Sequence, residues 1–279
     1  MYEIVEKKDL APGIHLLEIK APLIAKRAKA GQFVMLMTDD KGERIPLTMA
    51  DWSPEKGTVT IIAMEAGKTT MQLGTLKVGD KLRSIVGPLG IETHTHGHGT
   101  VVCVGGGIGI ALMFPTVRAM KQAGNKVISI MGARSKNLLI MEEEIKKYSD
   151  EMYPCTDDGS YGHHGFVSDI LKKMLDDKSK KIDVVYAVGP IIMMKVISDL
   201  TKPYGVNTIV SLNPIMVDGT GMCGSCRVLV YGKTKFGCVD GPDFDGHKVD
   251  FGLLITRNKR YMEEEKASVE KFKKAKGVC

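Results

Sequence analysis

The sequence has 279 residues, of which 43% are hydrophobic and 26% are charged, a composition typical of globular proteins with one or two domains. Its 39 basic and 33 acidic residues give a net charge of +6 that is spread along the chain, and only 6% of the residues are aromatic. Both features argue against a nucleic-acid-binding surface. The N-terminus has no apolar signal region, and the longest apolar run, residues 101–115, is too short to span a bilayer. We therefore expect a cytoplasmic protein with reduced cysteines that binds neither nucleic acid nor membrane.

The first 95 residues are predicted to form a small antiparallel β-barrel or sandwich. Segments rich in β-forming residues occupy 13–21, 31–38, 57–64 and 81–90, and turns containing Gly, Pro or Asp separate them. Short strands at regular spacing with such turns are typical of an all-β domain.

Strands then alternate with helices in residues 96–215. A buried strand, a glycine turn and a helix occupy 99–124. A strand, a helix and a later strand are predicted at 125–134, 138–148 and 182–190. This alternation predicts a doubly wound parallel sheet, so that the chain is a β-barrel followed by an α/β domain.

The remaining chain divides into a cysteine-bearing segment, residues 216–250, and a C-terminal tail, residues 251–279. From Tyr261 onward the tail mixes acidic and basic residues and predicts an exposed helix. Its last residue, Cys279, is interpreted as an incidental terminal thiol.

A glycine-rich turn separates the first buried strand of the α/β region from its helix. Glycines permit positive φ and let a diphosphate approach the backbone, and the helix N-terminus favours its negative charge. A second turn, Gly189-Pro190, ends the later strand, and ligands of open α/β sheets bind at the carboxyl ends of strands. The pattern favours a nucleotide site over a turn tightened only for packing. The glycines of the first turn are Gly105, Gly106, Gly107 and Gly109.

The choice between NAD and NADP depends on the charges beside this site. Arg134 follows the second strand, where a 2′-phosphate would be recognised, although an arginine there is equally consistent with a solvated surface residue. Asp157 and Asp158 would oppose that phosphate and favour NAD. His163 and His164 in the same glycine-rich stretch have no further ligand at metal spacing and are interpreted as loop residues.

Three of the six cysteines lie in residues 217–238, which read D-x4-C-x2-C-x11-C from Asp218. Plant-type [2Fe–2S] loops have the spacing C-x4-C-x2-C with a distant fourth cysteine. Every position fits except the first, where an aspartate replaces a thiolate. The residues alone leave open a cluster with one carboxylate ligand, a structural zinc site or a metal-free remnant.

Seven motifs together resemble the ferredoxin–NADP reductase superfamily over essentially the whole chain. They are RIPLT (44–48), GKTT (67–70), GPLG (87–90), VGGGIGIA (104–111), TDDGSYG (156–162), VGPIIMM (188–194) and the loop 217–238. The resemblance is closer to the branch of dihydroorotate dehydrogenase electron-transfer subunits. It is closest to the small subunits of NADH-dependent reduced ferredoxin:NADP oxidoreductases.

The resemblance implies that the β-barrel binds FAD. In the superfamily an Arg-x-Tyr-Ser/Thr strand holds the flavin, and Thr48 matches its hydroxyl, which reaches the isoalloxazine edge. Arg44 lies one residue further upstream than the arginine that pairs with phosphate. The FAD contacts implied by the matching positions are Arg44, Pro46, Leu47, Thr48, Ile62, Ala63, Met64, Gly67, Lys68, Thr69 and Thr70. The predicted NAD(H) contacts are Gly105, Gly106, Gly107, Gly109, Arg134, Asp157, Asp158, Gly159, Gly189 and Pro190.

The resemblance also bears on the cysteine loop. Some small subunits of this kind have an aspartate at the first ligand position, whereas the dihydroorotate dehydrogenase subunits have cysteine. We therefore predict a [2Fe–2S] cluster ligated by Asp218, Cys223, Cys226 and Cys238.

The implied activity is hydride transfer between NAD(H) and FAD, followed by single-electron transfer between FAD and the cluster. The implied partner is a larger subunit with another FAD, [4Fe–4S] clusters and the NADP(H) site, so that the heterodimer couples NADPH, NAD+ and ferredoxin by electron bifurcation. The main alternative is the electron-transfer subunit of an NAD-dependent dihydroorotate dehydrogenase. A zinc-containing regulator without flavin and a free-standing NADH diaphorase are also compatible with the sequence.

Overall fold

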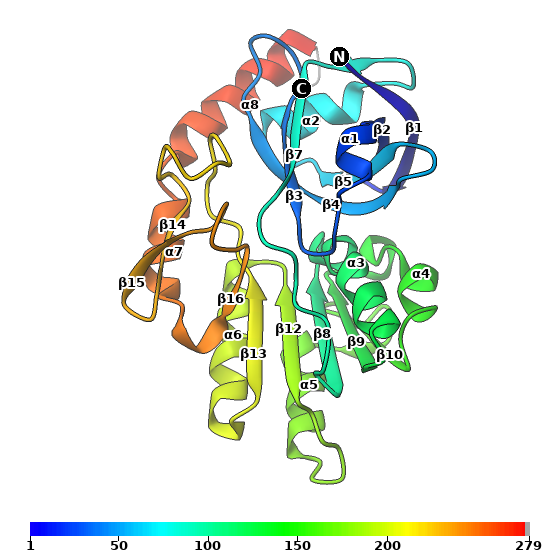
Figure 1. The fold of residues 1–279 in the computed structure, drawn as a ribbon, viewed down its shortest axis with the longest axis vertical. Helices are drawn as coiled ribbons and strands as arrows, with labels where there is room; N and C mark the ends of the chain where they lie inside the picture. The colour runs from blue at the N-terminus through cyan, green and yellow to red at the C-terminus, as the bar shows by residue number, and fades with distance from the viewer. Residues whose placement is uncertain (277–279) are drawn as a thin grey trace.

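The computed structural model describes residues 1–276 and shows a β domain, an α/β domain and a C-terminal segment that runs along one side of both (Figure 1). Cys279 lies outside the described residues, and the interpretation of its thiol stays a prediction. The predicted order, a β-barrel followed by a doubly wound α/β domain, is confirmed.

The β domain is one antiparallel sheet with the strand order β6-β1-β2-β5-β4-β3-β7. Its edge strands β6 and β7 are separated only by Arg83, and the sheet curves almost into a barrel. The apolar side chains of its concave face are buried together, among them Leu17, Val34 and Ile61. The elements are β1 (Tyr2–Ala11), β2 (Ile14–Lys20), α1 (Pro22–Ala25), β3 (Phe33–Met37), β4 (Ile45–Ser53), β5 (Thr58–Met64), α2 (Lys68–Thr75), β6 (Lys81–Leu82) and β7 (Ser84–Leu89).

The α/β domain is built on a second seven-stranded sheet with the order β11-β10-β9-β8-β12-β13-β16. Its strands are parallel except for β16, which joins from the C-terminal segment and pairs antiparallel with β13. The elements before this segment are β8 (Thr100–Gly106), α3 (Gly109–Gln122), β9 (Lys126–Ala133), η1 (Lys136–Leu138), α4 (Glu142–Lys146), β10 (Glu151–Thr156), β11 (His163–His164), α5 (Val167–Asp176), β12 (Val184–Val188), α6 (Ile191–Thr201), η2 (Lys202–Tyr204) and β13 (Asn207–Ser211).

One predicted helix is shorter than expected. The sequence predicts a helix over 138–148, but a 3₁₀ turn ends at Leu138 and the α-helix begins only at Glu142. Met141 has a φ of 57°, in the left-handed region, and a right-handed helix cannot pass through such a residue. The prediction of one continuous helix there is wrong.

Helix α3 joins the two domains, because one of its faces packs on the parallel sheet and the other on the β domain. Ile14, Ala50 and Ile62 of the β domain belong to the same buried cluster as α3. At the edge of this contact Arg118 Nη1 lies 2.7 Å from Asp51 Oδ1, and its guanidinium lies 5.2 Å from the centre of the Trp52 ring. Apolar burial and this ion pair therefore hold the domains in one arrangement.

The C-terminal segment contacts both domains. It contains β14 (Arg227–Val230), β15 (Lys233–Phe236), β16 (Asp243–Asp245), η3 (Gly246–Lys248), α7 (Phe251–Asn258) and α8 (Met262–Lys276). Helix α8 returns to α2 of the β domain and has no buried residue, in agreement with the predicted exposed helix (Figure 1). None of the helices in residues 1–276 combines the length and the apolar character that a bilayer crossing requires.

Candidate functional site

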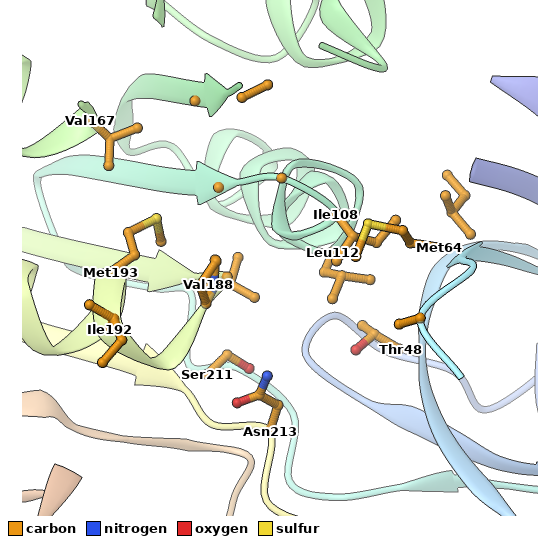
Figure 2. A pocket seen from close by; sticks show the side chains of 18 of the residues that line it. Thr48, Met64, Ile108, Leu112, Val167, Val188, Ile192, Met193, Ser211 and Asn213 are labelled. Atoms are coloured by element: carbon orange, nitrogen blue, oxygen red, sulfur yellow. The ribbon is translucent and has the colours of Figure 1, made fainter. Parts of the chain in front are cut away.

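A cavity of about 990 Å³ lies between the β domain and the α/β domain (Figure 2). Its walls are strands β4 and β5 on one side and the turns that follow β8, β9, β12 and β13 on the other. The carboxyl ends of parallel strands thus face a β-sheet wall, the position expected for a ligand of an open α/β sheet. Predicted site residues that line the cavity are Pro46, Leu47, Thr48, Ile62, Ala63, Met64, Thr70, Gly106, Gly107, Arg134, Asp157, Gly189 and Pro190. Predicted site residues outside its lining are Arg44, Gly67, Lys68, Thr69, Gly105, Gly109, Asp158 and Gly159.

The β-domain wall is mostly apolar, with a hydroxyl at one end. Thr48 lies on β4 and pairs with Phe33 of β3, which also lines the cavity. Met64 ends β5 near Ile108 and Leu112 of the opposite wall (Figure 2). A flat aromatic ring system fits such a surface, because apolar side chains contact its faces and a hydroxyl can bond its polar edge.

The start of α2 supplies polar groups beside this wall. The hydroxyl of Thr70 accepts hydrogen bonds from the backbone N–H groups of Ala66 (2.9 Å) and Gly67 (3.0 Å) and so fixes the turn before the helix. The buried hydroxyl of Thr69 has no partner within the part of the chain that the structure describes. Buried hydroxyls normally have partners, and first-turn N–H groups of a helix favour anions, so these residues fit a flavin diphosphate. Arg44 is exposed in the loop before β4.

The glycines of the β8–α3 turn divide into two sets. A Cβ on Gly109 would lie 2.2 Å from the carbonyl oxygen of Val188, and a Cβ on Gly105 would lie 2.8 Å from Met113 Sδ. These two glycines therefore permit close packing of α3 on the sheet. Gly107 has a φ of +57° and open space where a Cβ would point, and it lines the cavity with Gly106. Gly106 and Gly107 thus form the part of the turn that fits a diphosphate.

Charged groups collect at the far end of the cavity, at the carboxyl ends of β9 and β10. Arg134 and Asp157 both line it. Asp158 lies just outside, and the side chain and the backbone N–H (2.9 Å) of Ser160 lower the pKa of its carboxyl. This end fits the ribose of a nicotinamide dinucleotide. His163 and His164 form the edge strand β11, as part of the sheet.

Several cavity residues were not anticipated from the sequence. Ser211 ends β13, Asn213 follows it, and both lie on the wall beside Val188 (Figure 2). Phe33 and Met216 line the end near Thr48, and Cys155 lies near Asp157. The position of Ser211 at the carboxyl end of a parallel strand is the signal that could have identified it.

The four predicted cluster ligands lie in one loop, but the structure brings only two of them together. Cys226 and Cys238 are buried with their sulfur atoms 3.2 Å apart. Cys223 is exposed, and the Asp218 carboxylate accepts hydrogen bonds from the N–H groups of Thr220 (2.8 Å) and Cys223 (2.7 Å). Among residues 1–276 no three His, Cys, Asp or Glu side chains converge in a metal-binding arrangement.

The donor set of the loop nevertheless fits a [2Fe–2S] cluster. The hydrogen bond from Thr220 is the main cause of a lowered pKa for Asp218, which is therefore an ionised oxygen donor. Each of its oxygens keeps a second lone pair for a metal. Gly219 and Gly221 have φ values of +76° and +84°, which let the backbone wrap around a small inorganic group. Assignment of all four ligands stays a prediction.

The cavity and the cysteine pair share one wall. Phe33 and Met216 line the cavity, and both belong to a small buried apolar cluster that also contains Cys226 and Cys238. One buried apolar cluster therefore extends from the Thr48 end of the cavity to the two thiols.

Comparisons with known proteins match the α/β domain and the cysteine loop to described families. Residues 103–199 match the oxidoreductase NAD-binding domain, and residues 213–250 match the iron–sulfur cluster binding domain of dihydroorotate dehydrogenase B. A dihydroorotate dehydrogenase B (NAD(+)) electron transfer subunit homolog from Thermotoga maritima is 47% identical over 99% of this chain and 96% of its own length. The dihydroorotate dehydrogenase B (NAD(+)) electron transfer subunit of Enterococcus faecalis is 33% identical over 89% of this chain and 97% of its own length.

A solved structure of the NADH-dependent reduced ferredoxin-NADP oxidoreductase, a subject of work on flavin-based electron bifurcation, contains a similar chain. It superposes with a TM-score of 0.92 at 46% identity and 98% coverage of both chains. Fold and site together define an oxidoreductase subunit with a nicotinamide-nucleotide domain and an iron–sulfur segment. The chain belongs to the family of dihydroorotate dehydrogenase B electron transfer subunits and their homologues. The family resemblance predicted from the sequence is confirmed.

Proposed function

We propose that this chain is an electron-transfer subunit that moves electrons between NAD(H), FAD and a [2Fe–2S] cluster. The observation that carries this proposal is the wall of Phe33 and Met216 shared by the cavity and the Cys226–Cys238 pair. The FAD supplies the conversion between the two-electron chemistry of nicotinamide and the one-electron chemistry of an iron–sulfur cluster.

The residues of the chain bind and orient these groups. Thr48 offers its hydroxyl to the ring system, and the start of α2, beside the cavity residues Ala66 and Thr70, offers backbone N–H groups to the flavin diphosphate. Gly106 and Gly107 would admit the diphosphate of the nicotinamide nucleotide. The two walls of the cavity are largely apolar and exclude water from the place of hydride transfer.

We further propose that the chain works in a heterodimer as the NAD-linked branch of an electron-bifurcating NADH-dependent ferredoxin:NADP+ oxidoreductase. The larger subunit would carry another FAD, [4Fe–4S] clusters and the NADP(H) site, and would exchange electrons with ferredoxin. The whole-chain similarity to the NADH-dependent reduced ferredoxin-NADP oxidoreductase supports this function. Exposed apolar side chains around the cysteine loop, Val217 (51%), Met222 (89%) and Val239 (44%), support contact with another protein there.

A second candidate is the electron-transfer subunit of an NAD-dependent dihydroorotate dehydrogenase. The names of the relatives from Thermotoga maritima and Enterococcus faecalis favour it. The two candidates share the internal path of electrons and differ in the partner. Purification of the native complex separates them: a dihydroorotate-oxidising partner supports the second, and a partner that reduces NADP+ with ferredoxin supports the first.

The deciding experiment is an anaerobic titration of the purified chain with NADH and, separately, with NADPH. Flavin bleaching is followed optically, and the cluster by low-temperature EPR. Reduction of the flavin by NADH together with a [2Fe–2S] signal, which Cys226→Ser abolishes, is the expected result. Flavin bleaching without an iron signal would leave a flavoprotein with a zinc or metal-free loop, and the bifurcation function would fail.

A further inference from the structure

When a hydride is transferred to the flavin and its electrons pass on to the cluster, one proton remains, because the cluster does not accept it. A hydride consists of one proton and two electrons, whereas an iron–sulfur cluster accepts electrons alone. When the electrons leave the cavity one after the other toward the cluster, the proton must pass to a group of the protein or to water. The need for such a proton acceptor rests on the function proposed above.

The titratable side chains in the described cavity lining are far from the end of β13, where Ser211 lies. They are Arg134, Cys155 and Asp157, at the carboxyl ends of β9 and β10. Burial raises the pKa of the Cys155 thiol to about 12. Neighbouring strands are about 4.8 Å apart, and β8 and β12 separate β9 from β13, so these groups lie roughly 14 Å or more from the end of β13.

Ser211, at the end of β13, lies between the cavity and the carboxyl group of Asp243. Ser211 lines the cavity (Figure 2) and is paired in register with Asp243 of β16. The Ser211 hydroxyl lies beside the Asp243 carboxyl in this register pair and partly opposes the rise of its pKa. The carboxyl accepts hydrogen bonds from the hydroxyls of Thr93 (2.5 Å) and Tyr186 (3.2 Å).

Within residues 1–276, the groups that face Asp243 are hydroxyls, without an opposing charge. Thr93 faces it from the connection between the domains, Ser211 from β13 and Tyr186 from β12. Tyr186 is the titratable group among them, and burial raises its pKa, so it stays neutral. Burial also raises the pKa of Asp243 to about 6, which the three hydroxyls partly oppose.

We propose that Asp243 accepts, through the hydroxyl of Ser211, the proton that remains in the cavity when the flavin passes its electrons to the cluster. The N–H bond formed by hydride transfer breaks, and its proton moves to the Ser211 oxygen. The proton of that hydroxyl moves to the Asp243 carboxylate, where an O–H bond forms. The two electrons leave through the cluster to a one-electron acceptor, so atoms and charge balance.

The test uses the complete chain with its flavin and cluster, reduced anaerobically and mixed with ferricyanide as the one-electron acceptor. Time-resolved infrared spectroscopy follows the carbonyl band of a protonated carboxyl, and flavin absorption follows the electrons. We expect the band to appear transiently as the flavin is oxidised. Asp243→Asn should abolish the band, and Ser211→Ala, which keeps the carboxyl but removes the connecting hydroxyl, should delay it at least tenfold.

The pH profile gives a second readout. An ionised carboxylate is required to accept the proton, so the rate of flavin oxidation should fall as the pH falls through about 6. In Asp243→Asn the rate should be about tenfold lower and should lack this step. Asp245→Asn is the matched control, because Asp245 lies on the same strand but bonds the Tyr231 hydroxyl (2.9 Å), and it should behave as the wild type.

Two results would overturn the inference. One is an Asp243→Asn chain that loses its electrons at the wild-type rate with an unchanged pH profile. The other is the absence of a carboxyl band in a wild type that oxidises normally. If Asp243→Asn does not fold, Ser211→Ala alone decides. Dithionite can reduce the chain in place of NADH, so failure of NADH to reduce the flavin would count against the proposed function and leave the relay testable.

Discussion

The sulfur atoms of Cys226 and Cys238 lie 3.2 Å apart and are buried, although 12 positions separate the two residues in the sequence. Burial, with a contribution from Cys226, raises the pKa of the Cys238 thiol to about 12. A metal that binds here must displace the proton of this thiol. Iron coordinates thiolates strongly enough to do so, whereas the protonated thiol is a poor nucleophile.

Replacement of either buried thiol tests this pair. Cys226→Ser or Cys238→Ser should reduce bound iron to a small fraction of the wild-type content, because each variant removes one thiolate from a site with four donors. Iron analysis and visible absorption of the purified variants measure the loss. Cys103→Ala is the control, since Cys103 is buried in β8, away from the loop, and its removal should leave the iron content unchanged. Full iron content in both serine variants would contradict the assignment.

Asp218 is the unusual member of the ligand set. Asp218→Cys should retain the cluster and shift its midpoint potential, because a thiolate replaces a carboxylate at the first ligand position. A potentiometric titration followed by EPR measures the shift. Asp218→Ala should hold less iron than either form. A cysteine variant without iron, or one with an unchanged potential, would show that Asp218 only caps its loop through the N–H groups of Thr220 and Cys223.

The predicted role of Gly107 in binding the NADH diphosphate can be separated from the backbone strain that any side chain would cause at this position. Gly107 and Gly124 have φ values of +57° and +86°, and both have open space at the Cβ position. An alanine at either site should cost about 1 kcal/mol of stability. Only Gly107→Ala should also raise the KM for NADH, by about tenfold, because its methyl group enters the cavity. Equal KM values for the two variants would mean that the diphosphate does not lie at this turn.

Nucleotide preference should depend on Asp157. Asp157→Ala removes a negative charge from the cavity end that also contains Arg134, so the ratio of kcat/KM for NADPH to that for NADH should rise by about tenfold. Asp158→Ala is the comparison, because Asp158 lies outside the cavity and bonds Ser160. A larger change in the Asp158 variant would reverse the assignment of these two carboxylates.

Asp243 should make stability depend on pH. Its pKa in the folded chain, about 6, lies above the ordinary value of 3.8, so the folded state binds this proton more tightly than the unfolded state. The stabilisation is fully present below pH 3.8 and is lost as the pH rises to about 6. Relative to Asp243→Asn, the wild type should therefore lose at most about 3 kcal/mol between pH 4 and pH 7. Urea unfolding at both pH values measures this difference, and parallel curves for the two chains would exclude it.

Much of the fold could be predicted because its main signals are local. The glycine turn at 105–109 follows a continuous apolar strand, and that pattern alone indicates a parallel sheet. Strands β1 and β4 were missed. The first has a single buried residue and carries five charged residues in YEIVEKKDLA, and the second contains Pro46, so neither has a clean strand pattern. Met141 interrupts the predicted helix because its backbone is left-handed, and the periodicity of apolar residues does not indicate this.

The parts of the candidate site that could be predicted are those in which a single sequence motif forms one wall of the cavity. Gly106, Gly107 and Thr48, which the motifs identify as candidate cofactor contacts, line the cavity. The group of Thr93, Ser211 and Asp243 was not predictable, because pairing of β13 with β16 and the path of the domain connection bring these residues together. The missing information is therefore long-range contact, which spacing within a motif cannot supply.

The shared wall between cavity and cysteines also sets an order of assembly. Phe33 is made early in synthesis, but its partners Met216 and Cys238 follow about 200 residues later, which takes about 10–40 s at 5–20 residues per second. Until then the apolar side of β3 at Phe33 and Met35 lacks its cover. The ribosome must thus nearly finish the chain before the loop can receive iron and sulfide, and the nascent barrel needs protection from aggregation during that interval.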